Sequence, residues 1–117
     1  MSEIEIGNID YTKMDVDKHV TYDSLDGRVI IITGGGQGIG RGYAHYFAAQ
    51  GAIPVIAEYN GDSGERVAHE VQEKQGQALA IQTDVADIRS ATSMAEKTLS
   101  AFGRIDVLIN NAAVFSQ

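Results

Sequence analysis

The residues that carry chemistry most plainly are the glycines between Thr33 and Gly40, which follow the unbroken apolar run of residues 29–32. Glycine lacks a Cβ atom, so it permits positive φ in a tight turn and lets a bound group approach the main chain. Residues 41–50 then predict a helix, whose first N–H groups and positive dipole end would face the turn. Strand, glycine turn and helix together predict a phosphate site; a glycine turn that binds nothing is the alternative.

The spacing of the glycines separates several phosphate-binding motifs. A P-loop needs Lys and then Ser or Thr directly after its last glycine, where this chain has Arg41, and G-x-G-x-x-G fails in every register. The pattern that fits is T-G-x-x-x-G-x-G, formed by Thr33, Gly34, Gly38 and Gly40. On these residues the chain resembles the short-chain dehydrogenase/reductase family. The resemblance implies a nicotinamide cofactor held at this turn by Gly34, Gly36, Gln37, Gly38, Ile39 and Gly40.

Glu58 ends the second predicted strand, residues 53–58. In a dinucleotide site an acid at this place accepts hydrogen bonds from the adenosine ribose hydroxyls, and it repels an added 2′-phosphate. Gln37 is neutral at a position where NADP-preferring family members often carry a basic residue. Both residues indicate NAD; a plain surface acid is the alternative for Glu58. We expect Arg41 to be a solvated helix residue rather than a phosphate ligand.

Two further segments follow predicted strands and resemble cofactor contacts of the family. Asp84 and Val85 match its Asp-Val pair, in which the carboxylate accepts from the adenine amino group and the next N–H donates to the ring. Taken alone, Asp84 is equally compatible with a turn acid. Residues 110–113 resemble Asn-Asn-Ala-Gly beside the nicotinamide ribose, with alanine in place of the glycine, which implies contacts at Asn111, Ala112 and Ala113.

The family's catalytic Tyr-x-x-x-Lys pair does not occur in this sequence. In the family the tyrosine acts as acid or base on the substrate oxygen, and the lysine lowers its pKa. The residues four positions after the five tyrosines are Asp15, Asp26, Phe47, Gln50 and Ser63. Ser116 comes too soon after the fourth strand to be the family's serine, and the histidines lack metal-ligand spacing. We therefore assign no catalytic or metal-binding residue, and expect the 117-residue chain alone to be inactive.

The elements that position these residues alternate along the chain. Apolar runs predict strands at residues 29–32, 53–58, 78–83 and 105–110, and amphipathic patterns predict helices at 41–50, 60–76 and 87–102. Such alternation is typical of right-handed βαβ units and a parallel sheet. The predicted fold class is α/β, a Rossmann-like three-layer parallel sheet with helices on both faces. The family resemblance implies the strand order 3-2-1-4.

Helical spacing also predicts which side chains face the sheet. In the first helix these are Ile39, Tyr43, Ala44, Phe47 and Ala48. In the third helix they are Ile88, Ala91, Ala95, Leu99 and Phe102, and we expect the tyrosines to be packing groups. The fourth strand would form an uncovered apolar edge, so we expect either that the sequence is part of a longer protein or that the edge pairs with another chain, for which self-association is the leading expectation.

Composition limits the remaining possibilities. With 44% hydrophobic residues and a net charge of -7, the chain is typical of a globular domain and unsuited to a nucleic-acid surface. We divide it into an acidic extension, residues 1–24, which is either a mobile tail or a strap, and an incomplete NAD-binding domain, residues 25–117. Without cysteine, a signal peptide or a membrane-spanning stretch, we expect a cytoplasmic location.

The leading prediction is the NAD-binding portion of a short-chain dehydrogenase/reductase-like oxidoreductase, which moves hydride between nicotinamide and a small alcohol or carbonyl substrate. The substrate half of such an enzyme would lie outside this sequence. One alternative is a truncated, non-catalytic nucleotide-binding or interaction module. Another is a degenerate fragment without a stable fold.

Overall fold

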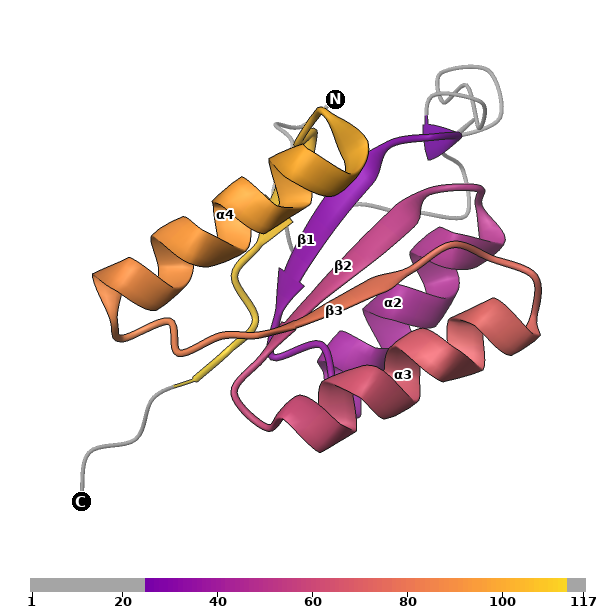
Figure 1. Cartoon of the computed structure of the whole chain (residues 1–117). Helices are drawn as coiled ribbons and strands as arrows, with labels where there is room; N and C mark the ends of the chain where they lie inside the picture. The colour runs from indigo at the N-terminus through magenta and orange to yellow at the C-terminus, as the bar shows by residue number, and fades with distance from the viewer. Residues whose placement is uncertain (1–24, 114–117) are drawn as a thin grey trace, which may run out of the picture.

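The structure is a computed structural model that describes residues 25–113; the predicted extension, residues 1–24, and Ser116 lie outside the described residues. Four strands form one parallel sheet in the order β3-β2-β1-β4, which confirms the predicted fold class and strand order (Figure 1). The strands are β1 (Val29–Thr33), β2 (Ile53–Glu58), β3 (Leu79–Gln82) and β4 (Val107–Ile109). Every residue of β1 is buried, as its continuous apolar run predicts for a strand covered on both faces.

Three helices connect the strands and cover both faces of the sheet. They are α2 (Gly38–Ala49), α3 (Gly61–Glu73) and α4 (Ile88–Phe102). In Figure 1, α2 and α3 lie on one face and α4 lies on the other. Alternate residues of β1 belong to the two resulting cores: Ile32 clusters with Ala44 and Val67, whereas Ile31 clusters with Met94. This is the predicted three-layer arrangement.

Local sequence signals explain where the helices begin and end. The side chain of Asn60 accepts the Ser63 N–H at the start of α3, and the side chain of Asp87 accepts the Arg89 N–H at the start of α4. Gly103 ends α4 in the left-handed region, with φ of 75°. These caps supply partners for terminal N–H groups and allow the chain to turn back toward the sheet.

The buried face of α4 differs in part from the predicted one. Ile88 is 80% exposed and Leu99 is 47% exposed, whereas Met94 and Thr98 are buried. Thr98 tolerates burial because its hydroxyl donates to the Met94 carbonyl oxygen at 2.8 Å. The predicted face is therefore covered only in part: Phe102 packs against the core and Ala91 and Ala95 are half-buried, but the centre of the buried surface lies at Met94 and Thr98.

The first helix also begins earlier than predicted and exposes more of its aromatic residues. Its first turn is formed by Gly38, Ile39 and Gly40, and Ile39 is 70% exposed. The prediction that the tyrosines are packing groups holds in part: Tyr43 and Tyr46 are exposed but pack against the ring of Phe47, with centroids 6.2 and 5.5 Å apart, whereas Tyr59 is 72% exposed.

The fourth strand forms the uncovered apolar edge that the sequence predicts. Val107 and Leu108 are 40% and 52% exposed. The start of β4 is nevertheless fixed to β1, because Asp106 accepts the Val29 N–H at 2.8 Å and donates its own N–H to the Val29 carbonyl oxygen. Hydrogen bonds from the Arg104 guanidinium and the Val29 N–H lower the pKa of Asp106 to about 2.

Candidate functional site

A cavity of about 700 Å³ lies where the strands end, at the carboxyl edge of the sheet. Open α/β sheets bind ligands at this edge, because the loops after parallel strands converge there. Eight predicted site residues line the cavity: Gly34, Gln37, Glu58, Asp84, Val85, Asn111, Ala112 and Ala113. The other four, Gly36, Gly38, Ile39 and Gly40, do not line it and instead build the turn and first helical turn beside it. Their roles as cofactor contacts stay predictions.

The glycine turn is compact because side chains at two positions would collide with neighbouring main chain. Gly34 has φ of 66°, and a Cβ atom there would lie 3.0 Å from the Ala112 Cα atom. A Cβ atom on Gly40 would overlap the Gly34 carbonyl oxygen. The glycines thus allow α2 to begin directly against the end of β1, with its first turn next to the cavity.

The N-terminus of α2 keeps donors available to an anion. Gln37 is the N-cap residue, but its side chain makes no capping hydrogen bond, and the first turn contains no acid. By contrast, the next helix is capped by Asn60. Uncapped N–H groups and the positive end of the helix dipole favour a phosphate group. This end of the cavity therefore suits the diphosphate of a dinucleotide.

Glu58 places a buried carboxylate in the cavity wall. The residue is 6% exposed. Its Oε1 atom accepts the Gly36 N–H at 3.0 Å, and its Oε2 atom accepts the Asn60 N–H at 3.0 Å. Each oxygen retains a further acceptor position for a ligand hydroxyl. The carboxylate is therefore held in place by main-chain donors on two sides.

The loop after β3 forms the wall next to Glu58. Asp84 Oδ1 accepts the Ala86 N–H at 3.0 Å, and the Asp84 N–H donates to Ser90 Oγ at 2.8 Å. Asp84 is thus a turn acid in this structure, and its second carboxylate oxygen leaves room for the predicted adenine contact. Val85, 38% exposed, presents an apolar side chain beside it.

The segment after β4 is tied to the end of β1 and to the glycine turn by the Thr33 hydroxyl and the Asn111 carboxamide. Thr33 Oγ1 accepts the N–H groups of Asn111 and Ala112 at 3.0 and 3.1 Å and lies 3.3 Å from the Ile109 carbonyl oxygen. The Asn111 side chain donates to the Gly34 carbonyl oxygen at 3.2 Å. These bonds fix the position of the Asn111–Ala113 wall relative to the end of β1. Thr33 belongs to the glycine motif, but the spacing of that motif does not show that its hydroxyl joins the two segments.

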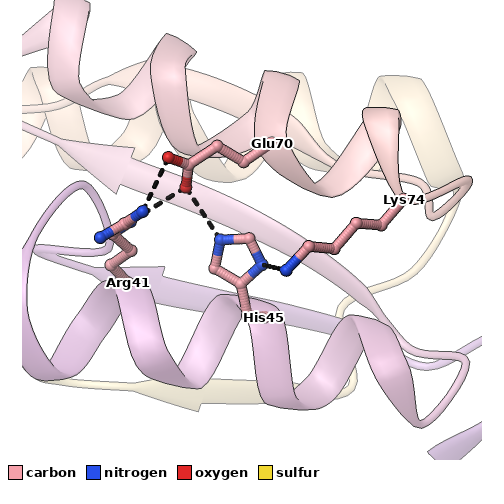
Figure 2. A network of polar contacts seen from close by, with 4 residues as sticks. All are labelled: Arg41, His45, Glu70 and Lys74. Atoms are coloured by element: carbon pink, nitrogen blue, oxygen red, sulfur yellow. Dashed lines mark hydrogen bonds and ion pairs between the residues drawn. The ribbon is translucent and has the colours of Figure 1, made fainter.

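Arg41 belongs to a polar network between α2 and α3 rather than to the cavity (Figure 2). Its Nε and Nη2 atoms lie 2.9 and 2.8 Å from the two carboxylate oxygens of Glu70. His45 Nε2 lies 2.8 Å from Glu70 Oε1, and Lys74 Nζ lies 3.5 Å from His45 Nδ1. Hydrogen bonds from Arg41, and secondly from His45, lower the pKa of Glu70 to about 2. Arg41 is an exposed residue of α2, as predicted, and the structure adds a bidentate interhelical ion pair that the sequence did not show.

Several cavity residues were not predicted from the sequence. They are Ala57, Tyr59, Asn60, Thr83 and Ala86. All of them lie within two positions of Glu58 or Asp84 in the sequence, so the rule that ligands bind at strand ends was sufficient to find them. Tyr59 is 72% exposed and provides an aromatic ring at the rim.

Residues 25–113 contain no group of three or more His, Cys, Asp or Glu side chains placed to hold a metal ion. None of the helices in this described part of the chain is long and apolar enough to cross a bilayer. The polar groups in the cavity wall are those of main-chain amides, carboxylates, hydroxyls and carboxamides.

The match to known families accounts for this geometry. Residues 28–117 match the family described as short chain dehydrogenase. The chain belongs to the short-chain dehydrogenase family. This confirms the resemblance inferred from the glycine spacing, and it explains the strand order and the cavity at the carboxyl edge of the sheet.

Similar proteins extend well beyond the matched region. An uncharacterized oxidoreductase of Thermotoga maritima is 44% identical over 92 residues, which are 79% of this chain and 36% of that protein. The 7alpha-hydroxysteroid dehydrogenase of Escherichia coli K12 is 40% identical over 88 residues, 75% of this chain and 34% of that protein. A crystal structure of 3-ketoacyl-(acyl-carrier-protein) reductase from Brucella melitensis, complexed with NADH, gives a TM-score of 0.72 at 40% identity and covers 77% of this chain and 36% of that one. The chain spans about a third of the length of these relatives.

Proposed function

We propose that this chain binds NAD in the cavity at the carboxyl edge of its sheet, as the cofactor-binding portion of a short-chain oxidoreductase. The observation that carries the proposal is the buried carboxylate of Glu58, which ends β2 and lines the cavity. The uncapped start of α2 next to the cavity supplies amide donors for a diphosphate. The relative from Brucella melitensis was crystallised with NADH, which supports a nicotinamide cofactor.

The charges of the cavity favour NAD over NADP. A carboxylate accepts hydrogen bonds from ribose hydroxyls, whereas it repels the 2′-phosphate of NADP. The described residues that line the cavity include the acids Glu58 and Asp84 and no lysine or arginine. Gln37, in the glycine turn, is neutral, so this wall provides no positive charge to balance the 2′-phosphate of NADP.

The remaining walls are assigned to the two ends of the cofactor. We place adenine against Asp84 and Val85, and the nicotinamide ribose against the segment Asn111–Ala113. The Asn111 carboxamide is engaged with the Gly34 carbonyl oxygen, so Asn111 supports the turn through its side chain and faces the ligand with its main chain. Ala113 is exposed, which leaves its methyl group free of close packing.

In a complete enzyme of this kind, hydride moves between nicotinamide and an alcohol or carbonyl carbon. The chain's own contribution is to hold and orient the cofactor, because its sequence contains no Tyr-x-x-x-Lys pair. We therefore propose that the 117-residue chain binds NAD without dehydrogenase activity. Turnover of an alcohol or ketone by the purified chain would contradict this part of the proposal. The cytoplasmic location stays a prediction.

Ligand-dependent stability tests the binding proposal. At a concentration about 100 times its dissociation constant, NAD should stabilise the folded chain by roughly 2.7 kcal/mol, and raise the melting temperature by roughly 10 °C or more. NADP at the same concentration should do less. If neither nucleotide shifts the melting temperature, the chain does not bind a nicotinamide cofactor under these conditions, and the proposal fails.

Replacing Glu58 tests the choice between the two nucleotides. Glu58→Ala should narrow the ratio of the NAD and NADP affinities, because it removes both the hydroxyl acceptor and the repulsive charge. Glu65→Ala is the matched control, since Glu65 is an exposed acid on α3 that does not line the cavity. If the ratio of the NAD and NADP affinities is unchanged in Glu58→Ala, Glu58 does not select between the two nucleotides.

The exposed edge of the sheet favours a second function, that of an interaction module. β4 presents Val107 and Leu108 to solvent, and α4 presents Ile88 and Leu99. An apolar unpaired edge is a template for strand pairing. We propose that the isolated chain self-associates through β4. Sedimentation velocity over a hundredfold range of concentration should show association, and a monomer throughout would refute it.

A further inference from the structure

The main-chain N–H of Gly36 is directed at a carboxylate of the protein. Gly36 lies in the glycine turn after β1, and its N–H donates to Glu58 Oε1 at 3.0 Å in a buried hydrogen bond. On the other side of the carboxylate, Oε2 accepts the Asn60 N–H at 3.0 Å. Gly36 itself is buried and does not line the cavity. The Gly36 N–H is therefore occupied by its hydrogen bond to Glu58.

The side chain of Glu58 occupies a slot between two glycines. A Cβ atom on Gly36 would lie 2.6 Å from Glu58 Cγ, 2.9 Å from Glu58 Oε1 and 3.0 Å from the Gly64 main-chain nitrogen. A Cβ atom on Gly64, in the first turn of α3, would lie 3.2 Å from Glu58 Cβ. Contacts below about 3.0 Å require a group to move, and the flexible group here is the Glu58 side chain.

We infer that Gly36 is a positioning residue for Glu58: its N–H and its missing Cβ atom together fix the carboxylate that selects NAD. Any side chain at position 36 displaces the carboxylate from the two main-chain donors that hold it. The inference rests on the proposed function, because the orientation of Glu58 matters to affinity only if the ribose binds there.

This assignment differs from the usual reason for glycine in such a turn, which is close approach of a ligand to the main chain. If Gly36 served the diphosphate directly, replacing it would weaken NAD binding whether or not Glu58 were present. If it acts through Glu58, the replacement has no further effect once the Glu58 carboxylate is gone. A double-mutant cycle separates the two cases.

The cycle compares the wild-type chain with Gly36→Ala, Glu58→Ala and the double variant. The dissociation constants for NAD and NADP are measured by titration calorimetry at fixed ionic strength. We expect Gly36→Ala to weaken NAD binding about tenfold, the loss of roughly one charge-assisted hydrogen bond, and to narrow the ratio of the NAD and NADP affinities. In the Glu58→Ala background the same change should alter neither constant by more than about twofold. Equal losses in both backgrounds would overturn the inference.

Gly42→Ala is the matched control for exchanging glycine for alanine. Gly42 lies in α2, and a Cβ atom there has no neighbouring atom within 4 Å. This variant should keep the wild-type affinity for both nucleotides. If Gly42→Ala loses as much affinity as Gly36→Ala, the loss comes from exchanging glycine for alanine in this region and not from displacement of Glu58, and the inference is wrong.

A second measurement decides the question even if Gly36→Ala does not fold. Amide hydrogen exchange of the ligand-free chain should show protected N–H groups at Gly36 and Asn60, and both should lose protection in Glu58→Ala. Unchanged protection at Gly36 would refute the inference. Failure of the wild-type chain to bind NAD would instead reject the proposed function while leaving the exchange result intact.

Discussion

Replacing Thr33 by valine should weaken the joint between β1 and β4 more than replacing it by serine. Thr33 is 4% exposed, and its Oγ1 atom accepts the N–H groups of Asn111 and Ala112. Its hydroxyl also lies within hydrogen-bond distance of the Ile109 carbonyl oxygen. Valine keeps the shape of threonine and prefers strands, but it removes all three contacts. Serine keeps the hydroxyl and loses only the buried methyl group.

The structure sets the expected size of each effect. A donor left without an acceptor costs about 1–3 kcal/mol. The Asn111 N–H keeps a second acceptor, the Ile109 carbonyl oxygen at 3.1 Å, so the cost of an unpaired donor applies to the partly buried Ala112 N–H. Thr33→Val should therefore lower the free energy of unfolding by roughly 2 kcal/mol, which includes the loss of one of the two acceptors of Asn111. Thr33→Ser should lower it by about 1 kcal/mol, which is typical for deleting one buried methyl group.

Urea unfolding followed by circular dichroism measures both changes, provided that the slope with denaturant stays constant across the variants. Strand propensity alone predicts the opposite order, with valine the more stable variant. A valine variant that equals or exceeds the serine variant would therefore refute the proposed role of the hydroxyl. Hydrogen exchange at Ala112 gives an independent check, because its N–H donates to the Thr33 hydroxyl and only the valine variant should lose protection there.

Three other predictions follow from contacts elsewhere in the structure. Gly40→Ala should destabilise the chain by roughly 2 kcal/mol or more in thermal unfolding, because its Cβ atom would overlap the Gly34 carbonyl oxygen. Glu70→Gln should cost roughly 1 kcal/mol near neutral pH, after screening by solvent. Since the folded-state pKa of Glu70 is lowered to about 2, the difference between wild type and variant should persist above the ordinary value of 4.5 and disappear as pH falls toward 2. A difference in unfolding free energy between wild type and variant that does not change with pH would contradict this prediction. Leu108→Lys should reduce concentration-dependent association, because the residue is 52% exposed on the edge strand; unchanged sedimentation would exclude this edge.

Features fixed by local periodicity could be predicted from the sequence. The buried β-branched run of β1, the Asp87 cap and the left-handed Gly103 each depend on residues close together in the chain. The strand order came with the family resemblance to the glycine motif. Ligands of such sheets bind where the strands end, and eight of the twelve predicted site residues do line one cavity there.

Features that depend on contacts between distant segments could not be predicted in this way. The ion pair between Arg41 and Glu70 joins residues 29 positions apart on different helices. The bond between the Gly36 N–H and Glu58 spans 22 positions, and nothing in the glycine spacing shows where the N–H points. The buried face of α4 was only partly predicted for a related reason: Thr98 can be buried because its hydroxyl bonds to its own helix, which hydrophobic spacing does not reveal.

The distribution of charge around the cavity constrains how a dinucleotide could be held. Arg41 stands three residues after the start of α2, yet both of its bonded nitrogens contact Glu70. The described lining residues supply acids at Glu58 and Asp84 and no basic side chain. Recruiting Arg41 to a phosphate would break a bidentate pair and leave Glu70 with His45 alone among its hydrogen-bond donors. In the proposed complex the amides at the start of α2 must therefore provide most of the attraction for the diphosphate, whereas Glu58 adds affinity at the ribose and selects between the two nucleotides.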